Sequence, residues 1–94
     1  DVLTVAAYAL HGDEVRARVV APKVGVPEDP ATGSVCGPLG AHLVRHGKRP
    51  AGPMTIRQGV ELGRPSLLDV EVTPEGDVLV GGACVVVGRG FLEL

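Results

Sequence analysis

The stretch EDPATGSVCGPLGAHLVRHG, residues 28–47, holds the clearest change of pattern in the chain. Before it, residues 22–30 contain three prolines and one glycine, which is typical of a constrained loop. From Thr32 onward, apolar side chains recur at helical spacing, at Val35, Cys36, Leu39, Leu43 and Val44. Thr32 or Ser34 suits the N-cap of such a helix, and Gly47 suits the position just after its end. We therefore expect a loop over residues 22–30, followed by a helix that begins near Thr32.

Small residues inside this helix indicate how it packs. Gly37, Gly40 and Ala41 leave little side chain on one part of its surface. A glycine within a helix costs about 0.5–1 kcal/mol relative to alanine, and close backbone approach is the usual compensation. Pro38 is expected near the first turn, where a missing N–H costs little. The pattern predicts a helix at the centre of a sheet or barrel.

The flanking sequence reads as strands. Residues 2–10 and 14–21 are joined by His11-Gly12-Asp13 and predict a hairpin. Residues 54–58 form a short strand ended by Gly59, and residues 66–73 alternate, with apolar side chains expected inward and Asp69 and Glu71 outward. After the turn at residues 74–77 come the most apolar strand, 78–87, bent at Gly81-Gly82, and an edge strand over 91–94. The expected order is β–β–loop–α–β–β–β, an α+β fold.

Composition narrows the class of protein. The 94 residues make one domain or less, and their core must be aliphatic, because aromatic residues are only 2% and valines number 17. The net charge of −2 argues against a nucleic-acid binder, and no apolar run is long enough to span a membrane. No secretory signal is visible and two cysteines are too few for a disulfide framework, so we expect reduced thiols in a cytoplasmic protein, the alternative being a single disulfide bridge. The absence of Asn and the single Gln fit a heat-adapted source or a GC-rich genome.

Residues 29–34 are the main candidate site. The first amides of a helix lack intrahelical acceptors and, with the helix dipole, can bind a carboxylate or phosphate. Gly33 permits close approach of a ligand, and the hydroxyls of Thr32 and Ser34 can either cap the helix or donate to that ligand. Asp29 precedes Pro30, so its backbone is extended and its side chain lies opposite that of Glu28. The same residues also suit an ordinary helix cap, and the phosphate-binding Gly-x-x-x-x-Gly-Lys-[Ser/Thr] motif is absent.

Other polar residues give weaker signals. We expect Cys36 to be a buried packing residue rather than a thiol activated by the helix N-terminus, and Cys84 to lie in the core. His42 and His46 have a spacing that can bind metal but lack a third ligand, so an exposed pair and no metal site are expected. Gln58 is expected to bond loop backbone. The remaining expectations are an exposed His11, an anion contact or ion pair for Arg64, and a solvated face for Arg16 and Arg18.

Several spaced motifs together resemble one family. They are EDPATGSVCG, the helix ending in His46-Gly47, QGVELGRPS and VLVGGACVVVG. The chain resembles the C-terminal half of the PhzF-like phenazine-biosynthesis proteins, most clearly from Glu14 onward. The resemblance implies a diaminopimelate-epimerase-like half, in which a curled, barrel-like, mixed or antiparallel sheet wraps around one central helix. Residues 1–94 would then be a single domain, equivalent to the C-terminal half of a two-domain isomerase.

The resemblance also implies a function, which is cofactor-independent proton transfer on carbon next to a carboxylate in a small acid. By position, Asp29 and Ser34 match the family's catalytic residues, while Thr32, Gly33, Ser34 and Gly37 form the substrate-binding set. The main acid/base would belong to an N-terminal half, either a separate chain or a missing segment, so residues 1–94 alone should be inactive. We expect an oligomer with a small carboxylate substrate and no cofactor, metal, nucleic acid or membrane. The alternative is a non-catalytic anion-binding or assembly module of the same fold.

Overall fold

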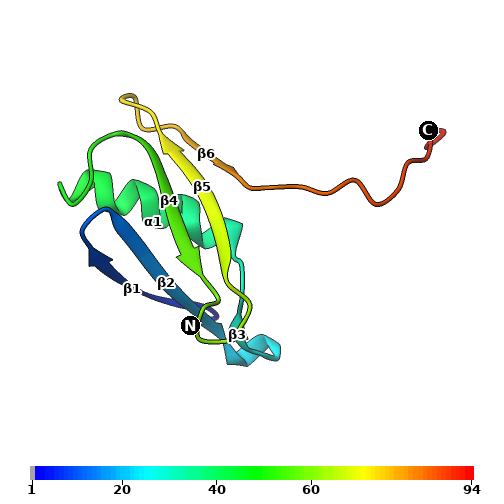
Figure 1. Ribbon diagram of the computed structural model, residues 1–94, viewed down its shortest axis with the longest axis horizontal. Coiled ribbons are helices and arrows are strands. Elements are labelled where there is room, and N and C mark those ends of the chain that lie inside the picture. The colour runs from blue at the N-terminus through cyan, green and yellow to red at the C-terminus, as the bar shows by residue number, and fades with distance from the viewer. Residues whose placement is uncertain (1) are drawn as a thin grey trace.

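The computed structural model describes residues 2–94 and contains six strands, one α-helix and one 3-10 helix (Figure 1). The chain forms β1 (Val5–His11), β2 (Glu14–Ala21), the 3-10 helix η1 (Pro22–Val24), β3 (Val26–Asp29), α1 (Gly33–Arg45), β4 (Gly52–Gln58), β5 (Ser66–Val72) and β6 (Val78–Gly81). The expected α+β class is confirmed, and so is the order of the main elements.

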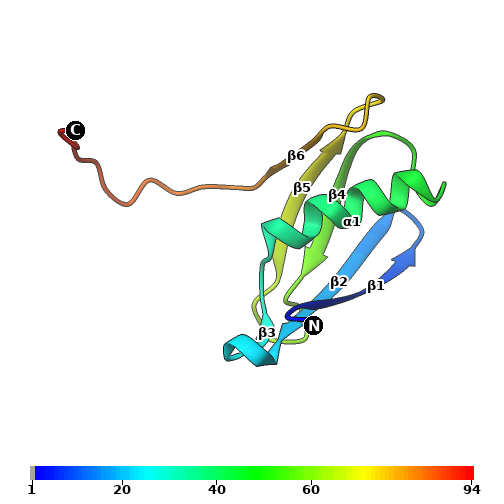
Figure 2. The ribbon, with the colours of Figure 1, turned by 180° about the vertical axis from the view of Figure 1, so that it is seen from behind.

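The strands make one mixed sheet in the order β1-β2-β4-β5-β6, with β3 added beside β2. All neighbours are antiparallel except β2 and β4, which run parallel and are connected through α1. The helix lies across one face of the sheet in both views (Figures 1 and 2). Within residues 2–94 the sheet is not closed into a barrel, because β1 and β6 form its two ends.

The core lies between α1 and the facing side of the sheet. Alternation in β2 and β5 confirms the expected pattern, since Val15, Ala17 and Val19 are buried, as are Leu68, Val70 and Val72. Leu43 of α1 and Ile56 of β4 are fully buried in the same cluster. Because only one face of the sheet is covered, Asp69 and Glu71 project from the other face.

The small residues of α1 allow the close packing expected of them. A Cβ atom on Gly40 would lie 2.7 Å from Cγ1 of Val70, and one on Gly37 would lie 3.2 Å from Cγ2 of Val80. Gly47 has φ +66° and follows the last helical residues, while the amide of Lys48 donates to Leu43 O at 2.8 Å. Gly47 thus occupies the position just after the end of the helix, as the sequence predicted.

Two local expectations about this segment need correction. Pro38 is the sixth residue of α1 and lies beyond the first turn, so the helix lacks one amide donor within its body. Residues 22–30 are not simply a loop, because they contain η1 and β3. Gly25, with φ +83°, reverses the chain after η1 so that Val26–Asp29 can pair with β2.

The largest departure is at the far end of the chain. The strand expected over 78–87 stops at Gly81, and residues 91–94 form no strand. Residues 82–94, called the tail from here on, run away from the sheet in an extended path (Figure 1). Cys84 lies on this tail and is exposed, contrary to the expected core position. Valine has high strand propensity, but a strand forms only where a partner supplies the ladder, and the tail has none within the described residues.

Candidate functional site

The candidate site is the bend of residues 29–34, which joins the end of β3 to the start of α1. Thr32 occupies the N-cap position, and its carbonyl accepts from the amides of Val35 and Cys36 at 3.1 and 3.0 Å. Within residues 2–94, the amides of Gly33 and Ser34 have no hydrogen-bond acceptor. Both residues are exposed, so two amide donors at the positive end of the helix dipole are open to a ligand.

The hydroxyl of Thr32 has a different use from the two that the sequence suggested. It donates to the Oδ2 atom of Asp29 and does not cap the helix. Its single proton is therefore committed to the carboxylate, and its oxygen accepts from Gln58 Nε2 and not from an amide of the first helical turn, so the helix has no side-chain cap at Thr32. Glu28 pairs instead with Arg18 at 2.6 Å. The two neighbouring carboxylates thus have separate partners, as their expected opposite orientations imply.

Gln58 supports the bend from the end of β4. Its Nε2 donates to the Asp29 carbonyl at 2.7 Å and to Oγ1 of Thr32 at 2.9 Å. Its Oε1 accepts from the Thr32 amide at 3.2 Å. Gln58 is fully buried, and the expectation that it bonds loop backbone is confirmed.

The other predicted site residues occupy two different environments. Ser34 borders a hollow of about 400 Å³ between α1 and β1, together with Tyr8, Pro38 and His42. Gly37 is buried and faces Val78 and Val80 of β6. The structure therefore brings Asp29, Thr32, Gly33 and Ser34 together at the bend. It places Gly37 about one helical turn further along α1.

Cys36 confirms the packing interpretation. It is fully buried, and its Sγ donates to Oε1 of Gln58 at 3.7 Å. Burial raises the pKa of the Cys36 thiol to about 11, so the thiol stays neutral at ordinary pH. A neutral, enclosed thiol is unsuited to act as a nucleophile or general base there.

His42 of α1 and His46, the residue that caps the end of α1, are both exposed, with ring centroids 4.4 Å apart. Nε2 of His42 lies 3.3 Å from the Tyr8 hydroxyl, a contact that sequence reasoning missed because it joins α1 to β1. Within residues 2–94 no three metal-ligating side chains gather in one place. In the same range, no helix has the length and apolar character needed to cross a membrane.

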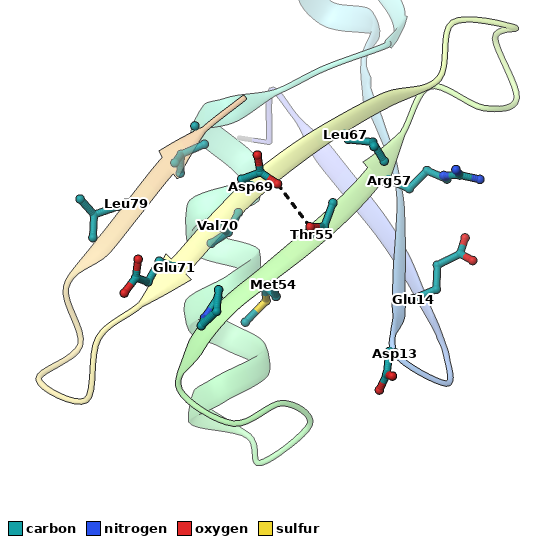
Figure 3. Close-up of a pocket in the computed structure, with 13 residues that line it drawn as sticks. Asp13, Glu14, Met54, Thr55, Arg57, Leu67, Asp69, Val70, Glu71 and Leu79 are labelled. Atoms are coloured by element: carbon teal, nitrogen blue, oxygen red, sulfur yellow. Dashed lines mark hydrogen bonds between the residues drawn. The ribbon is translucent and has the colours of Figure 1, made fainter. Parts of the chain in front are cut away.

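A second, larger hollow of about 790 Å³ lies on the sheet face opposite α1 (Figure 3). Its rim carries Asp13 and Glu14 from the first hairpin and Arg57, Asp69 and Glu71 from β4 and β5. Thr55 donates to Asp69 at 3.3 Å across these strands. None of the bend residues lines it, so it is separate from the candidate site.

Comparison with known proteins places this geometry in a family. The family model described as phenazine biosynthesis-like protein, PhzC-PhzF, matches residues 2–90. The chain belongs to the PhzC-PhzF family. The resemblance inferred from the spaced motifs is thereby confirmed.

Named relatives of this PhzC-PhzF member are isomerases. It is 45% identical over 92 residues to the trans-2,3-dihydro-3-hydroxyanthranilate isomerase of Pseudomonas fluorescens, covering 93% of this chain and 33% of that protein. An uncharacterized isomerase of Deinococcus radiodurans is 42% identical over 98 residues, covering 95% of this chain and 32% of that protein. A solved structure of a predicted epimerase from Pseudomonas aeruginosa matches with a TM-score of 0.64 at 46% identity, over 71% of this chain and 24% of that one. The chain thus spans about a third of the length of the curated relatives.

Proposed function

We propose that this chain is the anion-binding part of a cofactor-independent isomerase that moves a proton on carbon next to a carboxylate. The observation that carries the proposal is the pair of open amides at Gly33 and Ser34, beside the Asp29 carboxylate. Amides fixed at a helix N-terminus can bind a carboxylate and stabilise negative charge that develops on it during proton abstraction. The isomerase names of the relatives support the same reaction class.

Each predicted site residue has a role in this proposal. The Gly33 and Ser34 amides receive the substrate carboxylate, and the Ser34 hydroxyl adds a further donor. Asp29 orients a polar substrate group or the proton donor, as a positioned carboxylate can. Thr32 holds Asp29, and Gly37 lets β6 lie close beneath the first turns of α1.

The proposal requires a complementary half. The chain spans about a third of its relatives, and large apolar side chains on β6 and the tail are exposed. Extended apolar surface of this kind marks a place where another segment packs. We propose that an N-terminal half, as a segment of a longer chain or a separate one, covers this surface and brings the main acid/base to the bend.

A chimera tests the proposal. Residues 2–94 replace the matching segment of the Pseudomonas fluorescens isomerase, and proton NMR in D₂O follows isomerisation and deuterium uptake by trans-2,3-dihydro-3-hydroxyanthranilate. We expect turnover by the chimera, none by the 94-residue chain alone, and a loss of about 100-fold on Asp29→Asn. A folded chimera that exchanges no proton, while the intact Pseudomonas enzyme does, would contradict the proposal.

One observation favours a second candidate, a non-catalytic anion-binding or assembly module. The bend is closed on itself by the bonds among Asp29, Thr32 and Gln58, which is also how a purely structural turn would be built. In that case Asp29→Asn would alter the stability of the chimera, but the rate of proton transfer would equal that of the chimera with Asp29. The same kinetic measurement therefore separates the two functions.

A further inference from the structure

Among residues 2–94, Gln58 is a polar side chain in an otherwise apolar interior. It is fully buried at the end of β4, beneath the bend. Burying an amide without hydrogen bonds costs about 1–3 kcal/mol, so its contacts decide whether the position is tolerable. The Gln58 side chain makes four hydrogen bonds, to Asp29, Thr32 and Cys36, and all four join it to the bend or to the first turns of α1.

The orientation of the Gln58 amide follows from its backbone partners. The Asp29 carbonyl can only accept, so it must face Nε2, and the Thr32 amide can only donate, so it must face Oε1. Nε2 is then a donor toward Oγ1 of Thr32 as well. Because Oγ1 accepts from Gln58, its own proton is left for Asp29.

The geometry points to Gln58 as a positioning residue that acts through the Thr32 hydroxyl to hold the Asp29 carboxylate beside the open amides of Gly33 and Ser34. The side-chain hydrogen bonds form a series in which Nε2 of Gln58 donates to Oγ1 of Thr32, and Oγ1 of Thr32 donates to Oδ2 of Asp29. Oδ2 of Asp29 is thereby occupied, whereas Oδ1 has no hydrogen-bond partner within residues 2–94. The catalytic meaning of this chain of bonds rests on the proposed function.

Gly59 makes the arrangement sterically possible. It has φ +81°, and a Cβ atom there would fall on the Arg64 carbonyl oxygen and lie 2.8 Å from the Pro30 carbonyl oxygen. The chain can therefore pass directly under Pro30 only because residue 59 lacks a side chain. This brings the end of β4 close enough for Gln58 to reach both sides of the bend.

The first test measures the Asp29 side chain in the 94-residue chain by NMR three-bond couplings. We expect a single χ1 rotamer in the parent and rotamer averaging in both Gln58→Met and Thr32→Val. Thr55→Val is the matched control, because it also removes a hydroxyl that donates to a carboxylate, that of Asp69, on the exposed side of β4. Asp29 should be unaffected by this control.

Unchanged Asp29 couplings in Gln58→Met would overturn the inference. If Gln58→Met does not fold, the near-isosteric Thr32→Val decides, and an ordered Asp29 in that variant would overturn the inference equally. This arm needs no enzymatic activity. It therefore distinguishes failure of the positioning role from failure of the proposed function.

The second test uses the chimera. Gln58→Met and Thr32→Val should each lower kcat about tenfold or more, with KM within about twofold, because misplacement of a catalytic group affects mainly the chemical step. The double variant should lose no more than Thr32→Val alone, and Thr32→Ser should restore most of the rate. Losses that multiply in the double variant, or an unchanged kcat in an active chimera, would overturn the inference while leaving the isomerase proposal intact.

Discussion

The bend at residues 29–34 and the tail at residues 82–94 show two fates of similar sequence. Both contain glycine and alanine, and apolar residues follow, at positions 35 and 36 after the bend and at positions 85–87 within the tail. Directly after the bend, Gln58 of β4 and Val80 of β6 contact α1, where Cys36 and Gly37 are buried. On the tail every residue is exposed, and Val87 is 95% accessible, whereas Val70 in β5 is 1% accessible.

This difference shows that residue type alone does not decide burial. Full burial of a valine or leucine side chain stabilises a fold by about 1.5–3 kcal/mol, but only where another element supplies the opposing surface. The sheet and α1 supply that surface as far as β5. Beyond Gly81 the described residues offer no opposing element, so the hydrophobic contribution of the tail is available only to a partner segment.

Gly59→Ala should have the largest effect on the bend. The added Cβ would meet backbone oxygens on two sides at a positive φ, and we expect a loss of about 4 kcal/mol in the free energy of unfolding. Urea denaturation measures this loss. Gly63→Ala is the matched control, because Gly63 also has a positive φ, +70°, but a Cβ atom added there would meet nothing within 4 Å; its loss should be near 1 kcal/mol. Equal losses of unfolding free energy in the two variants would show that the backbone of Pro30 does not pack against residue 59.

A pair of leucine truncations should sharpen the contrast between core and tail. Leu43→Ala removes a fully buried side chain of α1 and should cost about 3 kcal/mol of unfolding free energy. Leu92→Ala removes a side chain that is 92% exposed and should change it by less than about 0.5 kcal/mol in the 94-residue chain. In the chimera, Leu92→Ala should lower the free energy of unfolding by more than about 1 kcal/mol if the N-terminal half packs on the tail. An unchanged value in the chimera would argue against the tail as a contact surface.

The two cysteines give the smallest predicted effect, and it depends on pH. Well below pH 9 the Cys36 thiol is neutral in both the folded and the unfolded chain. Between about pH 9 and 11 it ionises in the unfolded chain but not in the folded one, because its folded pKa is raised to about 11. The free energy of unfolding should therefore fall by at most about 2 kcal/mol over that range. The comparison is between Cys84→Ser and the double variant Cys36→Ala/Cys84→Ser, which should lack this component.

Thiol labelling checks the same assignment at neutral pH. In the native chain Cys84 should react with a thiol reagent rapidly, and Cys36 only on unfolding. Rapid modification of both cysteines in the folded chain would contradict the buried position of Cys36.

Sequence reasoning anticipated the features governed by local chemistry. The alternation in residues 14–21 and 66–72, the helix with its small residues and Gly47 at its end, and the turn at residues 74–77 all depend on near neighbours along the chain. It also identified the bend as the candidate site. Pro30 restricts the backbone there and Gly33 frees it, and both effects are independent of the surrounding structure. The spaced motifs were sufficient to indicate the family.

The remaining features depend on contacts between distant segments. The sequence alone determined that Thr32 has one hydroxyl proton and that its side chain could cap the helix or donate to a ligand. Only the tertiary structure decided that the proton goes to Asp29, because β4 brings Gln58 beneath the bend from 26 residues further along the chain. In the same way, the valines of residues 85–87 carry strand propensity in their side chains, but pairing requires a neighbouring backbone. The position of that neighbour is a property of the folded molecule and not of the local sequence.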